Sequence, residues 1–287
     1  MTSSPFSIRR TDPYSPPEEH RRLQHEEPVA RVESAEQRRH IWTIAKHEDV
    51  RAVLGDTRFS SDRSNPHHPA HMAYNPGTHA GALIEMDPPE HGIVRGRVMN
   101  EFTVKKVAAM RPRVEEVVTT TIDAMLASGT SGDLVELLSL PVPSTVIAEL
   151  LGVPYQDHRF FQDNSAKFTE HEAPQEEKVA AIQALRSYIA GLVDDRLQSP
   201  GEDILSRQIA AGASREEAIG LGFLLLIAGH ETTANMISLS IMTLLDKPDL
   251  LQQLRDRPEL LPGAVEELLR YFTIAGESGG LRLAVDD

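Results

Sequence analysis

An acid and two alcohols stand together inside an apolar segment. The run Ala228–Thr233 reads AGHETT and follows the apolar residues 223–227. A segment that is apolar on every side is typical of a buried helix, where a carboxylate or hydroxyl needs a hydrogen-bond partner. Threonine hydroxyls can bond back to carbonyl groups one turn earlier, which locally loosens a helix. Glu231 beside Thr232 therefore predicts a proton relay into a dry cavity, and a polar patch in a helix pair is the alternative.

Two other interpretations of this region fail on spacing. A zinc-protease site would need a second histidine one turn after His230, and that position is Ala234. Gly220 and Gly222 are followed by no third glycine and preceded by no strand, so they do not match a dinucleotide-binding turn.

Two further pairs lie on predicted helices. Glu267 and Arg270 are three residues apart and share a helix face, where the alternative is an ordinary exposed ion pair. His91 and Arg95 are four apart, so both point one way and suit a carboxylate or phosphate. A solvated helix face is the alternative for this second pair.

A long loop over residues 60–81 carries four histidines. These are His67, His68, His71 and His79. Prolines at 66 and 69 break any helical register, and no carboxylate is suitably placed, so we interpret this segment as a solvated loop and not as a metal site. A loop of this length is uncommon unless it has a functional or mobile role.

The composition limits the class of function. Lys and Arg total 29 against 43 Asp and Glu, a formal net charge of −14, which disfavours binding to nucleic acid or to an anionic membrane. The polar start shows no signal-peptide core, and the apolar run Ala218–Gly229 is too short to span a bilayer, so we expect a cytoplasmic protein. The sequence contains no cysteine, which excludes disulfides, cysteine-ligated metals and a cysteine nucleophile within these residues.

The elements that must position these residues are mostly helices. We expect an irregular lead-in up to residue 27, a small sheet from Pro28–Val32 and His40–Ala45, and a short helix at His47–Gly55. Apolar spacing, with Gly and Pro at the joints, predicts helices at Glu90–Asn100, Val104–Ala127, Val142–Leu151, Gln156–Thr169, Gln175–Leu197, Arg215–Leu245, Pro248–Arg257 and Leu261–Ile274. Leu281–Val285 is predicted to begin a strand, and no partner strand follows it. We predict one mainly α domain with a minor β-sheet over residues 1–287.

The order and distances of these motifs together resemble the soluble bacterial cytochrome P-450 family. The resemblance rests on Ala228–Thr233, on Glu267-x-x-Arg270, on Asp87-Pro88-Pro89-Glu90-His91 with Arg95, on Arg282, and on Arg58–Asp62 and Leu151–Pro154. It implies a haem-thiolate monooxygenase that hydroxylates a small organic substrate with dioxygen and electrons from a ferredoxin-type redox partner.

The resemblance also implies a role for each site residue. Glu231 and Thr232 would be catalytic and help deliver protons to oxygen. Ala228 and Gly229 would lie against the haem, and His91, Arg95 and Arg282 would bind its propionates. Glu267 and Arg270 would form a buried structural pair, and the loop at 60–81 would contact substrate.

The sequence departs from the family in having no cysteine to bind the haem iron. We therefore expect a chain that is incomplete at its C-terminus, poorly stable, and inactive in oxygen insertion as written. The alternative is a non-catalytic family member that stabilises a partner enzyme. Such helper proteins usually keep the full length and lose the acid–alcohol pair, which is intact here.

Overall fold

The computed structural model describes residues 12, 14–34, 39–69, 81–169, 174–272, 274 and 280–286. The chain divides into two compact units, which are described separately. Unit 1 comprises residues 1–76, 84–90 and 275–287, and unit 2 comprises residues 77–83 and 91–274. The short turn η2 (Leu83–Glu85) and helix α4 (Glu90–Met99) each begin in one unit and end in the other. The prediction of one domain stays a prediction.

Unit 1 is built from a hairpin, two short helices and a small second sheet. Strands β1 (Val29–Ser34) and β2 (Arg39–Ile44) pair antiparallel, with Val29 opposite Ile44. They form the small sheet that was expected from Pro28–Val32 and His40–Ala45. Helix α2 covers His47–Gly55, the predicted range. The expectation of an irregular lead-in is wrong for Glu18–Glu26, which forms helix α1 and buries Leu23.

The last strand has a partner, which corrects the expectation that it would be unpaired. Strand β4 (Leu283–Ala284) pairs antiparallel with β3 (Phe59–Ser60), and the Val285 N–H donates to the Arg58 carbonyl at 2.9 Å. The partner strand lies more than 200 residues upstream, so no local sequence pattern predicts the pairing.

Unit 2 consists almost wholly of helices. They are α4, α5 (Val104–Ala127), η3 (Val135–Ser139), α6 (Pro141–Leu151), η4 (Tyr155–Asp157), α7 (His158–Thr169), α8 (Gln175–Gln198), α9 (Ile204–Ala210), α10 (Arg215–Asp246), α11 (Pro248–Asp256), η5 (Pro258–Leu260) and α12 (Leu261–Tyr271). All eight predicted helices are present. The π-helical turn η3 and the short helix α9 were not predicted, because each is too brief to show a periodic pattern.

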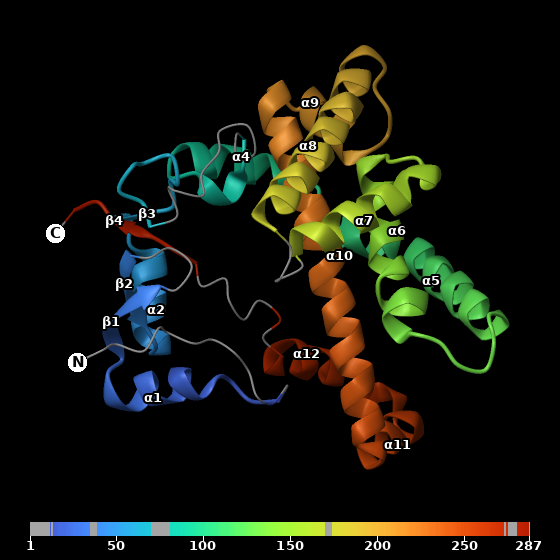
Figure 1. The fold of residues 1–287 in the computed structure, drawn as a ribbon. Coiled ribbons are helices and arrows are strands. Elements are labelled where there is room, and N and C mark those ends of the chain that lie inside the picture. The colour runs from blue at the N-terminus through green and yellow to red at the C-terminus, as the bar shows by residue number, and fades with distance from the viewer. Residues whose placement is uncertain are drawn as a thin grey trace. The chain divides into compact units, whose positions relative to one another are not determined.

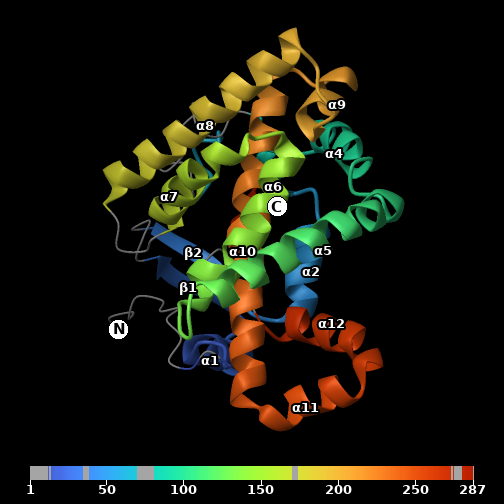
Figure 2. The same ribbon diagram turned by 90° about the vertical axis from the view of Figure 1, so that its right-hand side faces the viewer.

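Helix α10 is the axis of unit 2. A capping box starts it: the Ser214 hydroxyl accepts from the Glu217 N–H, and the Glu217 carboxylate accepts from the Ser214 N–H. Helices α6, α8 and α9 pack against its first part, and α11 and α12 follow its far end (Figures 1 and 2). None of the described helices combines the length and apolarity needed to cross a bilayer.

The core of unit 2 lies around the first half of α10. Leucines and isoleucines of α6, α8 and α9, including Leu151, Leu185, Ile189 and Leu205, are almost fully buried there. Gly222 allows this close approach, since a Cβ at its position would lie 2.8 Å from Cγ2 of Ile189. By contrast, α11 and α12 bury no residue fully. The well-packed core therefore fixes the N-terminal half of α10 and leaves its far half less covered.

Candidate functional site

Helix α10 has two unlike faces where it carries the AGHETT run. Leu226, His230 and Ala234 follow one another at intervals of four and are buried. Ala228 and Thr232 lie about 200° around the helix from that row and are exposed. The prediction of a helix buried on every side is therefore wrong for this stretch. Among the described residues of unit 2, nothing packs over the Ala228–Thr232 face closely enough to bury it.

Both threonines bond back to the helix as predicted. Thr232 Oγ1 donates to the Ala228 carbonyl at 2.6 Å, and Thr233 Oγ1 donates to the Gly229 carbonyl at 3.2 Å. The helix nevertheless stays continuously α-helical through them. Thr232 uses its proton on the backbone, so its oxygen can still accept a hydrogen bond from a molecule on the open face. Glu231 is half-buried beside it.

Gly229 faces a neighbouring helix. A Cβ at Gly229 would lie 3.0 Å from Cδ1 of Ile147 in α6, so the glycine permits close packing of α6 against α10. This close contact explains why a glycine occupies position 229, which the sequence pattern does not predict. The small residues of the run divide their roles, since Ala228 lies on the open face and Gly229 lies against α6.

His230 points into the interior. It is 2% exposed and lines a cavity of about 10 Å³ with residues of α6 and α7, among them Ser144 and His158. Burial lowers the pKa of the His230 imidazole, and a contact with the Leu226 carbonyl partly offsets this effect. His230 is thus a neutral core residue that holds α10 with its other face outward.

Helix α4 carries the predicted anion-binding pair. His91 is half-buried and Arg95 is exposed. Within the described part of the chain, neither side chain has an ion pair or a hydrogen bond, whereas most other arginines of the unit are paired with a carboxylate. Two donors on one face without a partner are available to an anionic group.

Glu267 and Arg270 form the predicted pair on α12. Arg270 donates twice to the carboxylate, with Nε–Oε2 and Nη2–Oε1 both at 2.7 Å, and these bonds hold the pKa of Glu267 below its ordinary value. Both side chains are more than half exposed, so the expectation that the pair is buried is wrong. No described element covers this side of α12, and the bidentate geometry comes from the i, i+3 spacing alone.

Arg282 belongs to unit 1, as do the described histidines of the loop, His67 and His68. The Arg282 side chain is half-buried in unit 1 and donates from Nη1 to the carbonyl of Leu281 at 2.9 Å. His68 is fully buried, which overturns the interpretation of this loop as solvated at that position, and burial lowers the pKa of its imidazole. His71 and His79 lie outside the described residues. No three acidic or histidine side chains are grouped to bind a metal in the described part of the chain.

Two contacts in unit 2 could not be predicted from the sequence. A Cβ on Gly220 would lie 2.2 Å from the carbonyl oxygen of Gly81, so the loop backbone rests directly on α10. The sequence shows the glycine pair at 220 and 222, but beyond the excluded dinucleotide-binding turn it suggests no role for them. Glu101 of the α4–α5 turn binds Arg207 of α9, and no pattern links residues so far apart in sequence.

The comparisons with known proteins agree with this arrangement. The chain is 45% identical over 291 residues to cytochrome P450 105A3 of Streptomyces carbophilus, which covers 98% of this chain and 70% of the relative. It is 44% identical over 290 residues to vitamin D3 dihydroxylase of Streptomyces griseolus, covering 98% of this chain and 71% of that relative. No protein-family model matches it.

Solved structures give the same answer. The crystal structure of cytochrome P450 MoxA from Nonomuraea recticatena has a TM-score of 0.79 at 41% identity, covering 95% of this chain and 70% of that one. The LnmA cytochrome P450 hydroxylase of Streptomyces atroolivaceus has a TM-score of 0.84 at 33% identity, covering 97% and 71%. The predicted mainly α fold with a minor sheet is confirmed, and the chain belongs to the cytochrome P450 family, whose cofactor is haem.

Proposed function

We propose that these residues form the distal part of a haem-thiolate monooxygenase, the part that faces oxygen and substrate. The observation that carries the proposal is the open face of α10, where Thr232 and Ala228 are exposed next to Glu231. The relatives include a vitamin D3 dihydroxylase and a nocardicin C N-oxygenase, whose names describe oxidation of small organic molecules. We extend that substrate class to this chain, with dioxygen and a ferredoxin-type redox partner.

The residues of unit 2 suit a haem group on two counts. The Ala228–Thr232 face offers a small side chain and a hydroxyl without bulk, and His91 and Arg95 are two donors without a protein partner. Haem, where bound, supplies the redox chemistry with dioxygen. His91 and Arg95 would bind its propionates, and Ala228 and the Gly229 backbone would border it. For Arg282, which belongs to unit 1, propionate binding is proposed from the family resemblance alone. Glu267 and Arg270, exposed in these residues, would take a structural role once a segment with the thiolate ligand is joined to the chain.

Glu231 and Thr232 would move protons on this face. Glu231 is half-buried, so its carboxylate can exchange protons with solvent and pass them inward. The Thr232 oxygen can accept a hydrogen bond from a water while its own proton is held by the Ala228 carbonyl. Together they form a short path from solvent to the open face, with His230 excluded from it because it points into the core.

These 287 residues contain no thiolate to bind iron on the opposite side of a haem, because they include no cysteine. We therefore propose that the chain alone does not insert oxygen. The test is to add haem to the purified chain, reduce it and add carbon monoxide. We expect a Soret band without the thiolate-type shift, and the appearance of that shift would contradict the proposal.

The distal role can be tested by supplying the missing ligand. The unmatched part of the Streptomyces griseolus relative, joined after residue 287, should restore the thiolate-type Soret band with carbon monoxide. In that fusion protein, Thr232→Ala should divert reducing equivalents from product to peroxide. Thr233→Ala is the matched control, because it removes a hydroxyl with the same backbone bond. Equal product yields in the two variants would contradict the proposed relay.

The propionate-binding role has its own test. His91→Leu and Arg95→Leu should each weaken haem binding, because a charge-assisted hydrogen bond contributes about 1.5–3 kcal/mol, which is roughly 10-fold or more in affinity. Arg111→Leu is the control, since Arg111 is an exposed arginine of α5. Titration followed at the Soret band measures all three, and equal losses in the three variants would contradict the assignment.

A further inference from the structure

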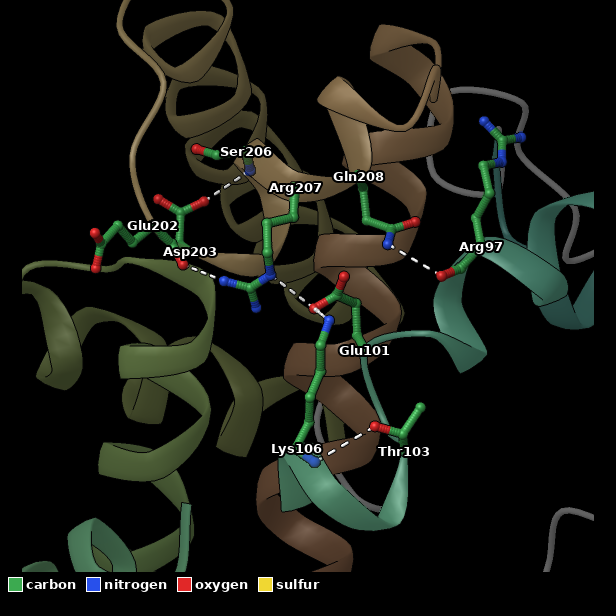
Figure 3. Close-up of polar contacts among 9 residues, drawn as sticks. All are labelled: Arg97, Glu101, Thr103, Lys106, Glu202, Asp203, Ser206, Arg207 and Gln208. Carbon is green, nitrogen blue, oxygen red and sulfur yellow. Dashed lines mark hydrogen bonds and ion pairs between the residues drawn. The ribbon is translucent and has the colours of Figure 1, made fainter. Parts of the chain in front are cut away.

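A buried carboxylate lies at the junction of α4, α5 and α9. Glu101 belongs to the turn between α4 and α5, and its side chain is only 8% exposed. Its Oε2 accepts from Lys106 Nζ at 3.0 Å and from Arg207 Nε at 2.7 Å, as Figure 3 shows. Arg207 also donates to the carbonyl of Glu202, which precedes α9. One carboxylate therefore ties the end of α4 to the first turn of α5 and to α9.

Glu101 stays ionised in this position. Burial by itself would raise the pKa of the Glu101 carboxyl, but the hydrogen bonds and charges of Arg207 and Lys106 hold it below its ordinary value. Removing the carboxylate would leave two cations facing each other without a counter-charge. Such a partly buried, doubly bonded group contributes more than an exposed surface pair.

A second tie joins the same end of α4 to the start of α10. Arg97 donates to both oxygens of Glu217, with Nη2–Oε1 at 2.6 Å and Nη1–Oε2 at 3.3 Å. Gln208 of α9, itself 2% exposed, donates from Nε2 to the Arg97 carbonyl at 3.3 Å (Figure 3). Because Glu217 is also the carboxylate of the capping box, this tie fixes α4 to the point where α10 begins.

These ties matter because α4 has little apolar anchoring. Val94 and Val98 are its only buried residues within the described chain. Arg95 and Arg97 are two positions apart and so project about 200° from one another. When Arg97 is bound to Glu217, Arg95 must point to the other side of α4. The polar ties thus determine the direction of the two donors without a partner, His91 and Arg95.

We propose that Glu101, held by Lys106 and Arg207, is a positioning residue that fixes α4 so that His91 and Arg95 can bind the carboxylates of a haem. This inference rests on the proposed function. Glu101 would contact no cofactor atom, and its effect would pass entirely through the orientation of α4.

The test compares haem with its dimethyl ester, which lacks free carboxylates. Glu101→Gln in the 287-residue chain should weaken haem binding about tenfold, the lower range for removing a residue that supports a ligand. Its affinity for the ester should match that of the parent chain. Glu115→Gln, on an exposed face of α5, is the matched control and should change neither affinity. Equal losses of haem and ester affinity would overturn the proposal, since they would indicate general destabilisation.

Arg207 provides a second variant. Arg207→Gln should reproduce the loss of haem affinity, and Arg207→Lys should retain most of it, because the charge beside Glu101 remains. Loss of affinity in both Arg207 variants, with retention in Glu101→Gln, would contradict a role centred on the carboxylate.

Hydrogen exchange separates this inference from the proposed function. Glu101→Gln should speed amide exchange in α4 while exchange in α8 stays unchanged. Unchanged exchange in α4 would overturn the positioning role. Equal haem and ester affinity in the parent chain would instead overturn propionate binding by His91 and Arg95.

Discussion

The contact between Gly220 and Gly81 gives the sharpest quantitative prediction. A Cβ on residue 220 would lie 2.2 Å from the Gly81 carbonyl oxygen and 2.3 Å from its carbon, whereas real Cβ atoms essentially never approach within 3.0 Å. Gly220→Ala therefore forces the loop backbone to move by about 0.8 Å or the helix to shift. Overpacking of this kind costs about 1–3 kcal/mol, offset by about 1 kcal/mol of improved helix propensity. Because the obstacle is backbone, we expect the upper end of this cost, about 3 kcal/mol, and so a net loss of about 2 kcal/mol.

Two other helical glycines provide comparisons for the free-energy change expected for Gly220→Ala. Gly191 of α8 is exposed, and a Cβ at its position would have nothing within 4 Å, so Gly191→Ala should stabilise the chain by about 1 kcal/mol. Gly222→Ala meets the Ile189 side chain at 2.8 Å and should fall between the two. Urea unfolding followed by far-ultraviolet circular dichroism measures the series. If Gly220→Ala stabilised the chain as much as Gly191→Ala, the contact would not exist as described.

Three further predictions concern pH, packing and charge. Burial lowers the folded pKa of His230, so its contribution to stability is present above the unfolded pKa of about 6.5 and is lost as the pH falls below that value. His230→Gln should therefore flatten the acid-side dependence of unfolding free energy on pH, measured by urea unfolding at several pH values. An unchanged slope would contradict this prediction. Leu185→Ala, in the core of α8, should cost about 2–5 kcal/mol in urea unfolding, whereas exposed Leu197→Ala should cost little. Glu267→Gln should leave the thermal midpoint unchanged, because the pair with Arg270 is exposed, and a clear drop would indicate that the pair is covered in solution.

The sequence predicted helices well where apolar spacing is long. The range Val104–Ala127 was predicted to the residue, and the α10 prediction ended one residue early. Length made these patterns unambiguous. Helix α9 has seven residues, and its signal is the Asp203 side chain that accepts from the Ser206 N–H, which is common to many turns.

The site was predictable in type but not in exposure. Residue patterns indicate that a helix is apolar, but they do not indicate which neighbour covers each face. For this reason the pair Glu267–Arg270 was expected inside and lies outside. The burial of Glu101 could not be predicted either, because it depends on Arg207, whose position follows only from the packing of α9. Local chemistry was visible in the sequence, whereas contacts between distant segments required the fold.

The pairing of β3 with β4 has a consequence for the order of events during synthesis. Phe59 leaves the ribosome early, but its partner Ala284 is made only after nearly all of unit 2 has been translated. Unit 2 is therefore inserted between the pieces of unit 1, and its local helices can form while β3 still has an unpaired edge. Translation at about 5–20 residues per second leaves that edge exposed for many seconds. We expect the nascent chain to be most vulnerable to misassociation during this interval, before β4 pairs with β3.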